Sequence, residues 1–279
     1  MNIYIIGLGL IGSSIARAIR KKQLNHKIYG YDIDFDSVKY ALEENIIDES
    51  FSYENIDLDA SSNSLIIVAA SPSVSATIFT QLQHLFNIKS LVITDVCSIK
   101  NHLLNELSGT NAANIVFSHP MAGSHLSGVE SGNEDLFDNK YVLISPFKSE
   151  NEAIKIVEDF WCSLDVIPHT IKAEDHDSLL SATSHLPHIL VYALLQFLQE
   201  KDIQDLEKVS GGGLQSLLRI GSSSPKMWND IFLSNKNNLT KDIDAIIESL
   251  NKLKTEINLE GSSLEDLLTS LKNFKEDTL

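Results

Sequence analysis

The side chain best suited to acid–base chemistry is His119, which follows a short, largely apolar run at 114–117. That run predicts a buried strand, and Pro120 should stop it from continuing, so His119 falls at the strand's carboxyl end. Open α/β sheets place their ligands at this end. Because an imidazole can accept a proton near neutral pH, His119 is the candidate base. The chain holds nine His, however, and the alternative is an ordinary loop residue.

Two further side chains could serve the same site. Ser98 follows a predicted strand at 91–94 and should face the same crevice as His119; alternatively, Ser98 or Asp95 simply caps the next helix. Arg219 is one of three arginines in the chain, and the other two lie on the first predicted helix. Its planar guanidinium could bind a substrate carboxylate, although a chance position on a helix surface is an equal alternative.

The beginning of the chain carries a dinucleotide-binding pattern. A predicted strand at 2–6 runs into three glycines spaced G-x-G-x-x-G and then into a predicted helix at 13–22. The glycines and the helix N-terminus should bind a pyrophosphate; the alternative is a turn used only for packing. Asp32, after a strand at 27–31, should select NAD over NADP by accepting the ribose 2′-hydroxyl. The predicted cofactor-binding residues are Gly7, Gly9, Leu10, Ile11, Gly12, Asp32, Ser71 and Pro72.

Strands and helices alternate over most of the chain, which favours a Rossmann-type, mainly parallel sheet. The signals for strands vanish after Ala173, and only helices are expected beyond it. We therefore predict an α/β fold with a dinucleotide-binding domain at 1–172 and an all-helical substrate and dimerisation domain at 173–279. Within the first domain the remaining strands are expected at 64–68, 91–94, 141–144 and 165–171, and the helices at 36–44, 74–86 and 151–162, after Ser98, and in the acidic stretch between Gly128 and Tyr141.

The expected helical domain holds two further sequence features. His185 and His188 lie at a predicted helix start, where Pro187 would be tolerated, and they either share a face or diverge. Trp228 is expected to pack in the core or to form a pocket wall. A polar–apolar repeat at 235–257 offers an apolar stripe to a partner, because so small a helical domain buries little core alone. We expect a homodimer through these C-terminal helices.

The composition excludes several classes of protein. A formal net charge of −16 argues against binding to nucleic acids and to anionic membranes. The two cysteines make neither a disulfide framework nor a metal site, and no metal is expected. The first strand begins at Asn2, which leaves no room for a cleavable leader, and the apolar run at 65–70 is too short to span a membrane. We expect a soluble, cytoplasmic protein.

Several motifs, taken in chain order, resemble the prephenate and arogenate dehydrogenases of tyrosine biosynthesis. The resemblance extends to about Asn238 and fits the short, monofunctional form of the family. The sequence departs from many relatives at Ser124-His125, where they carry Thr-Glu, and at the neutral pair Gln215-Ser216. The motifs are the glycine pattern, Asp95-x-x-Ser98-x-Lys100, His119-Pro120-Met121-Ala122-Gly123, Asp175-His176-Asp177, Ser184-His185-Leu186-Pro187-His188, Gly211-Gly212-Gly213 through Arg219, and Pro225-x-Met227-Trp228.

The resemblance implies an enzyme that decarboxylates prephenate oxidatively to 4-hydroxyphenylpyruvate, with NAD as cofactor. It assigns catalysis to His119, which would accept the proton of the ring hydroxyl, and to Ser98, which would orient that hydroxyl. Arogenate is the alternative substrate, and a non-enzymatic NAD-binding module is the third hypothesis. The residues that the resemblance assigns to substrate binding are Arg219, His188, Ser124, Ser184 and Trp228.

Overall fold

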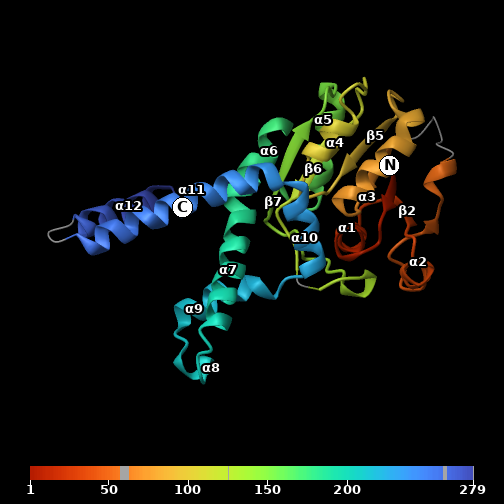
Figure 1. Cartoon of the computed structure of the whole chain (residues 1–279). Helices are drawn as coiled ribbons and strands as arrows, with labels where there is room; N and C mark the ends of the chain where they lie inside the picture. Colours follow the sequence, from red (N-terminus) through yellow and green to blue (C-terminus); the bar gives the residue numbers. More distant parts are fainter. Residues whose placement is uncertain (57–62, 125, 260–262, 279) are drawn as a thin grey trace.

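The computed structural model of the chain describes residues 1–56, 63–124, 126–259 and 263–278. A sheet region is followed by a helical region whose long helices project from it (Figure 1). This arrangement confirms the predicted fold class. The elements of the sheet region are β1 (Asn2–Ile6), α1 (Leu10–Lys21), β2 (Lys27–Tyr31), α2 (Phe35–Glu43), β3 (Glu49–Ser50), η1 (Tyr53–Asn55), β4 (Ser64–Val68), α3 (Pro72–Gln81), η2 (Leu82–Leu85), β5 (Leu91–Asp95), α4 (Asn101–Glu106), β6 (Val116–Pro120), η3 (Val129–Ser131), β7 (Tyr141–Pro146), α5 (Asn151–Ser163) and β8 (Ile167–Thr170).

The first sheet has five parallel strands in the order β3-β2-β1-β4-β5. Alternate side chains of β1 divide between its two faces. Ile3 and Ile5 pack in one apolar core, which α1 helps to form, whereas Tyr4 and Ile6 pack in a second core, which includes α3. Because both faces are covered, the strands need apolar residues at consecutive positions, which explains their unbroken apolar runs.

The second sheet joins β6, β7 and β8, and a bridge between Ile93 and Ile115 connects it to β5. The prediction that Pro120 stops the strand was wrong, because β6 includes this residue. The N–H of Met121 donates to the carbonyl of Tyr141 on β7. Hydrogen bonds alternate along an antiparallel pair, so the position of Pro120 requires no donor toward β7. His119 therefore lies inside the strand, one residue before its end.

The acidic stretch before β7 forms the short 3₁₀ turn η3, not the predicted α-helix. Asn133 explains much of this difference. Its side chain accepts a hydrogen bond from the N–H of Asp135 (2.9 Å), and its own N–H donates to Ser14 Oγ on α1 (2.9 Å). Such turn and tertiary bonds compete with the helical pattern, and they keep this stretch against α1.

The helical region begins with one continuous helix, Ala173–Glu200, which contains a π-helical turn. The helix start expected near Pro187 is therefore not a free start, because the residues before it are already helical. The π turn directly precedes Pro187 and interrupts the regular bonding pattern at the place where proline would otherwise disrupt it. The elements are α6 (Ala173–Leu180), η4 (Ser181–His185), α7 (Leu186–Glu200), α8 (Leu206–Val209), α9 (Gly212–Leu218), η5 (Arg219–Ser222), α10 (Pro225–Ser234), α11 (Lys236–Asn258) and α12 (Leu264–Thr278).

The same helix is long and apolar enough to cross a membrane by length and composition alone. It has no long unbroken apolar run, so it was not expected from the sequence. The first turns of this helix nevertheless carry buried polar groups, His176 and Asp177, and the Asp177 carboxylate contacts the backbone of α4. This end of the helix is therefore part of the protein interior.

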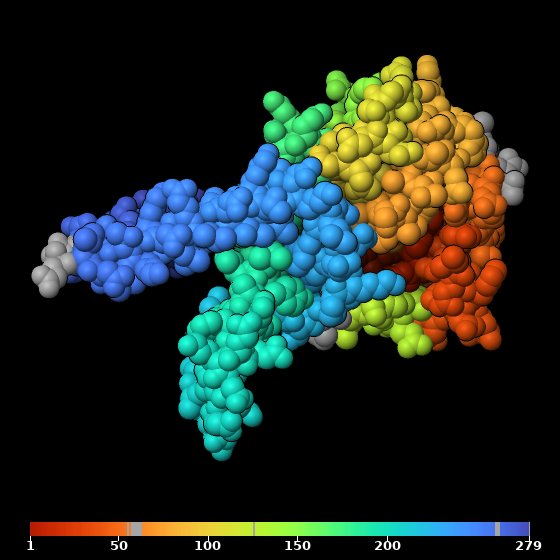
Figure 2. Space-filling view, in the orientation of Figure 1, coloured from red at the N-terminus to blue at the C-terminus, as the bar shows by residue number. Residues whose placement is uncertain are grey.

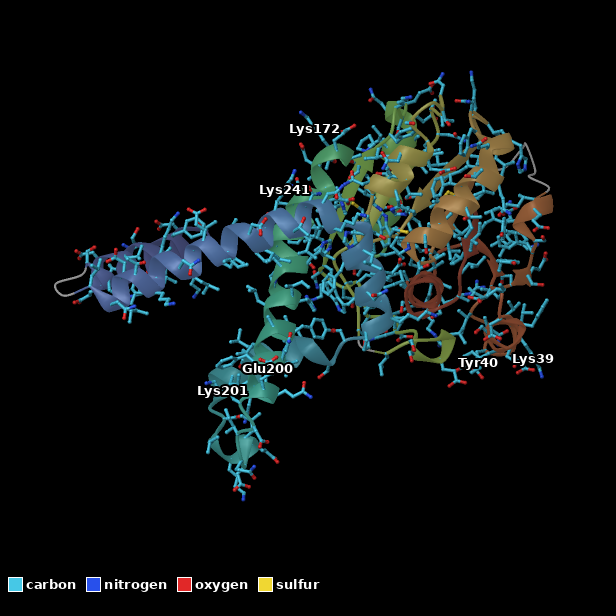
Figure 3. All side chains as sticks on the ribbon, viewed as in Figure 1. Lys39, Tyr40, Lys172, Glu200, Lys201 and Lys241 are labelled. Atoms are coloured by element: carbon cyan, nitrogen blue, oxygen red, sulfur yellow. The ribbon has the colours of Figure 1, made fainter. Side chains whose placement is uncertain are left out.

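Two arms extend from the body of the molecule. α11 and α12 lie side by side and form one arm, while α7, α8 and α9 form the other (Figures 1 and 2). Lys172 lies at the root of the second arm, and Glu200 and Lys201 lie at the end of its long helix (Figure 3). α10 lies between the arms and the sheet region, where it contacts α3.

Candidate active site

A cavity of about 1050 Å³ is lined by residues of both regions. On one side lie the loop after β1 and the ends of β4, β5 and β6; on the other lie η4, α7, η5 and α10. Four predicted site residues, Gly7, Gly12, Asp32 and Pro72, do not line the cavity. Those that do are Gly9, Leu10, Ile11, Ser71, Ser98, His119, Ser124, Ser184, His188, Arg219 and Trp228.

The three glycines of the loop after β1 have different surroundings. Gly7 has a φ of +100°, and a Cβ there would collide with the carbonyl of Ala69. A Cβ at Gly12 would collide with the carbonyl of Gly7, so this position needs glycine for close packing of α1. Gly9 is different, because no atom lies within 4 Å of where its Cβ would be, and it lines the cavity. The loop therefore leaves open space for a ligand next to its backbone at Gly9.

Asp32 supports this loop directly. Its carboxylate accepts a hydrogen bond from the N–H of Leu8 (2.7 Å) and another from the N–H of Asp34 (3.0 Å). Asp32 thus fixes the loop in addition to any contact that it makes with a cofactor. Pro72 is buried at the first position of α3, where it is well placed to start the helix, while its neighbour Ser71 lines the cavity.

His119 is nearly buried, with 9% of its surface exposed, and it lines the cavity. Its Nδ1 lies 3.0 Å from Nε2 of His176, and Nδ1 of His176 lies 2.7 Å from the Asp177 carboxylate. Burial lowers the pKa of His119 well below 6.5, and the charges of His176, Lys100 and His185 lower it further. His119 is therefore neutral at physiological pH, as a proton acceptor must be.

The loop that carries Ser98 is held by a buried ion pair between Lys100 and Asp95. The Lys100 ammonium also donates to the carbonyls of Cys97 (2.9 Å) and Ser118 (2.8 Å), and so ties this loop to β6. Neither Ser98 nor Asp95 caps α4, as one alternative had it. The Asp177 carboxylate instead accepts the first N–H groups of that helix, which leaves Ser98 in the cavity wall.

An aromatic wall closes another side of the cavity. The ring of His188 stacks on Trp228 with the centroids 3.6 Å apart, and His185 contacts the same indole edge-on. The two His therefore share a face. Trp228 is only 6% exposed and packs against Ile231, yet it also lines the cavity, so both predicted roles apply. Burial lowers the pKa of His185 to about 4.

Arg219 is the only described residue lining the cavity that carries a permanent charge, and no described lining residue is acidic. It begins the 3₁₀ turn η5, and its side chain is exposed. In a chain with a net charge of −16, this local excess of positive charge is well suited to an anionic ligand. His125, at which the sequence departs from many relatives, lies outside the described residues.

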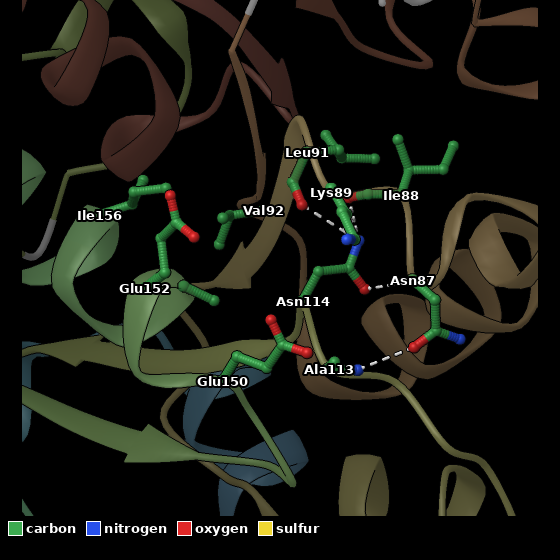
Figure 4. A pocket seen from close by; sticks show the side chains of 11 residues that line it. Asn87, Ile88, Lys89, Leu91, Val92, Ala113, Asn114, Glu150, Glu152 and Ile156 are labelled. Atoms are coloured by element: carbon green, nitrogen blue, oxygen red, sulfur yellow. Dashed lines mark hydrogen bonds between the residues drawn. The ribbon is translucent and has the colours of Figure 1, made fainter.

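A second, smaller cavity of about 340 Å³ lies between β5 and α5 and contains none of the predicted site residues (Figure 4). Its amide side chains hold the backbone together. Asn114 donates to the carbonyls of Leu85 (3.2 Å) and Leu91 (3.1 Å), and Asn87 accepts from the N–H of Ala113 (3.0 Å). These asparagines are occupied by backbone contacts, so the larger cavity remains the candidate site.

No role was predicted from the sequence for His176, Asp177 or Lys100, although each lies in one of the motifs that resemble the family. Their signal was weak because their contacts with β6, with α4 and with His119 join positions that are distant in the sequence. His119 and His176, for example, are separated by 57 positions. Only the fold brings them together.

The fold and the cavity define a class: a two-region dehydrogenase in which a parallel sheet with a glycine loop faces a helical region. Residues 15–167 match the family model "Prephenate dehydrogenase, nucleotide-binding domain", and residues 172–273 match "Prephenate dehydrogenase, dimerization domain". The chain belongs to the prephenate dehydrogenase family, and it is an oxidoreductase of tyrosine biosynthesis with a nucleotide-binding and a dimerisation domain.

Individual relatives agree with this family. Prephenate dehydrogenase of Bacillus subtilis is 31% identical over 280 residues, covering 99% of this chain and 74% of the relative. Cyclohexadienyl dehydrogenase of Zymomonas mobilis is 30% identical over 285 residues, covering 99% and 93%. The crystal structure of prephenate dehydrogenase from A. aeolicus, in complex with hydroxyphenyl propionate and NAD⁺, is 32% identical with a TM-score of 0.87, covering 99% of this chain and 98% of that one.

Proposed function

We propose that this protein catalyses the oxidative decarboxylation of prephenate to 4-hydroxyphenylpyruvate with NAD⁺. One observation carries the proposal: a neutral, buried His119 and the cationic Arg219 line the same cavity as the glycine loop. A base, an anion-binding group and a dinucleotide loop are what this reaction needs. We also propose the domain boundary at Lys172, between the end of β8 and the start of α6.

The cofactor proposal depends on the open space beside Gly9, where backbone and the N-terminus of α1 can receive a pyrophosphate. Asp32, half-buried at the end of β2, would accept the ribose 2′-hydroxyl and disfavour a 2′-phosphate. When bound, NAD⁺ would supply the acceptor for the hydride of C4 of the substrate ring. The remaining cofactor-binding residues of the proposal are Gly7, Leu10, Ile11, Gly12, Ser71 and Pro72.

The protein's own groups perform the rest of the reaction. His119 accepts the proton of the C4 hydroxyl as the C4–H bond breaks, and Ser98 orients that hydroxyl. Loss of CO₂ from C1 leaves its electron pair in the ring, which becomes aromatic, and His119 returns the proton to the ring oxygen to give the product hydroxyl. Arg219 binds a carboxylate of the substrate, while Trp228 and His188 form a flat wall against its ring. Ser124 and Ser184 line the same cavity and offer hydroxyl groups to the substrate.

Arogenate is the second candidate, since a relative of this chain is named cyclohexadienyl dehydrogenase. Arogenate carries an ammonium group where prephenate carries a keto group. Binding an ammonium favours a nearby carboxylate, and none of the described residues that line the cavity is Asp or Glu. This difference supports prephenate.

The test is NADH formation by the purified protein with prephenate or arogenate, each with NAD⁺ and NADP⁺. We expect turnover with prephenate and NAD⁺ to exceed that of the other combinations at least tenfold in kcat/KM, which corresponds to about 1.4 kcal/mol. The Arg219→Ala variant should raise KM for prephenate more than it lowers kcat. Higher kcat/KM with arogenate would reverse the substrate assignment, and no turnover with either would contradict the proposed reaction.

We further propose that the protein is a cytoplasmic homodimer, joined through its C-terminal helices. The family model describes residues 172–273 as a dimerisation domain. In support, α11 exposes Ile247, Leu250 and Ile257, which are between 50% and 68% exposed and lie on one stripe of the helix. Apolar surface of this kind in a single protomer is typical of an interface.

A further inference from the structure

A chain of three buried side chains connects the two regions behind the cavity. His119 belongs to β6 of the sheet region, while His176 and Asp177 belong to α6 of the helical region. Nδ1 of His119 lies 3.0 Å from Nε2 of His176, and Nδ1 of His176 lies 2.7 Å from Oδ1 of Asp177. His176 and Asp177 are fully buried, so water does not compete for these contacts. The contacts therefore lead from the Asp177 carboxylate to the ring of His176, from there to the ring of His119, and so to the cavity.

The protonation states of these three side chains follow from Asp177, the residue farthest from the cavity. Asp177 also accepts hydrogen bonds from the N–H of Lys100 (2.8 Å) and of Asn101 (2.7 Å). Burial alone would raise the pKa of Asp177, but the hydrogen bonds from His176 and these two N–H groups hold it below its ordinary value. Asp177 is therefore an ionised carboxylate, which can only accept hydrogen bonds.

Which ring nitrogens carry a hydrogen then follows in turn. Nδ1 of His176 must carry a hydrogen to donate to Asp177, so Nε2 of this neutral imidazole is an acceptor. His119 must in turn donate from Nδ1 to that acceptor. Its Nε2 consequently carries the lone pair, and this atom has no hydrogen-bond partner among the described residues, while the residue lines the cavity.

We propose that His176 and Asp177 are positioning residues that hold His119 as the Nδ1–H tautomer, with Nε2 presented to the substrate as the base. The inference rests on the proposed function for its catalytic meaning, but the tautomer itself does not depend on a substrate. When Nε2 takes the proton of the substrate hydroxyl, the positive charge on His119 is shared through Nδ1–H with a neighbour polarised by Asp177. The chain thus both orients the base and stabilises its protonated form.

Two simpler explanations account for less of the geometry. A helix cap explains why Asp177 contacts the N–H groups at the start of α4, but it gives no role to His176. A metal site would use the same residue types, yet the described residues contain no group of three or more His, Cys, Asp or Glu arranged to hold a metal ion. The direct contact between the two imidazoles is that of a hydrogen bond.

The test is 15N NMR of the histidine-labelled protein, in which two-bond proton–nitrogen correlations report the tautomer of each ring. The signals of His119 are assigned by their loss in His119→Asn. We expect Nδ1–H for His119 in the unmodified protein. In Asp177→Asn a neutral amide replaces the carboxylate whose charge favours a hydrogen on Nδ1 of His176, so a population of His119 in the Nε2–H tautomer should appear. Finding Nε2–H in the unmodified protein, or no conversion in the variant, would overturn the proposal.

Steady-state kinetics and two further variants complete the experiment. Asp177→Asn should lower kcat by about 10²–10⁴-fold, the contribution of a general base, with KM for prephenate changed little. His176→Phe retains the contact of Asp177 with the start of α4. It therefore tests the proposed positioning of His119 even if Asp177→Asn does not fold. It should also abolish the preference for Nδ1–H. The matched control is Asp242→Asn. The Asp242 carboxylate accepts a hydrogen bond from Ser181, which lies on the same long helix as Asp177, but Asp242 does not contact His119 or His176 among the described residues. A converted tautomer in this control would refute the specific role of Asp177.

The two measurements separate the inference from the proposed function. If the tautomers behave as expected but neither prephenate nor arogenate is oxidised, the reaction assignment fails and the assignment of the tautomer stands. If prephenate is oxidised and Asp177→Asn retains both kcat and the Nδ1–H tautomer, the reaction stands and His176 and Asp177 have only a structural role.

Discussion

The sheet region and the helical region differ in how they bury their apolar residues. In the sheet region, strands and helices enclose two large apolar cores, one on each face of the sheet. In the described helical region, the only buried apolar residues are Ala173, Leu180, Val191, Trp228, Ile231 and Leu239. Many large apolar side chains there are exposed instead, among them Phe197, Val209, Leu217, Leu233, Ile247, Leu250 and Phe274.

This difference shows how the site is divided between the regions. The sheet region, which encloses both large apolar cores, supplies His119 and the glycine loop to the cavity, while the helical region supplies Arg219, the aromatic wall and His176, which contacts His119. A helical region with so little core of its own gains rigidity from contacts with a partner. In the proposed dimer, the side of the cavity formed by the helical region therefore depends on helices that the partner stabilises.

The largest effect expected is on the sheet region, through its glycine loop. In Gly12→Ala the new methyl group would collide with the carbonyl of Gly7. We expect the free energy of unfolding to fall by more than about 4 kcal/mol, or the variant not to fold. The matched variant is Gly9→Ala, where the methyl group meets no atom within 4 Å. It should keep its urea midpoint and raise KM for NAD⁺. Equal urea midpoints for the two variants would contradict this division of roles.

A pH effect distinguishes the buried side of the helical region from its exposed arms. Burial holds the pKa of His185 at about 4, against 6.5 when unfolded, so the unfolded chain binds more protons between these pH values. Protonation of His185 should therefore not affect the free energy of unfolding above pH 6.5. Between pH 6.5 and pH 4 it should lower this free energy by about 3 kcal/mol. The free energy of unfolding is measured by urea titration at both ends of this range, for the unmodified protein and for His185→Gln. A stability difference between the two that does not shrink at low pH would contradict the account.

The smallest effect expected is on the arm formed by α11 and α12. Leu250→Glu places a charge on the apolar stripe of α11 and should raise the dissociation constant of the dimer about tenfold or more. Analytical ultracentrifugation measures this constant. Lys252→Ala is the control, because Lys252 is exposed, lies on the same helix and pairs only with Glu248 among the described residues. An unmodified protein that stays monomeric at micromolar concentrations would refute the dimer.

Sequence alone predicted most of the fold because local signals were strong. The G-x-G-x-x-G pattern follows a strand and leads into a helix, as expected, and β4 matches the predicted strand at 64–68. The errors came from tertiary contacts that override local preference. The stretch after Gly128 is held as a loop by α1, and a π turn lets Pro187 lie inside a helix. Neither contact leaves a signal in the nearby sequence.

The site could be predicted only in part for the same reason. His119, Ser98 and Arg219 were predicted from their residue types and positions, and the structure brings all three to one cavity. Their assigned roles remain predictions. The partners that determine how His119 works, His176 and Asp177, come from another region of the chain. Their importance depends on two interatomic distances, which no residue pattern supplies.

The central claim is that His119, held across both regions, is the base of an NAD⁺-dependent oxidation. The most direct test is the rate of NADH formation from prephenate by His119→Asn, with NAD⁺ binding measured by calorimetry on the same sample. The account predicts a kcat lower by about 10²–10⁴-fold, with an unchanged dissociation constant for NAD⁺, since asparagine cannot accept and retain the proton. A variant that retains the kcat of the unmodified protein would contradict it.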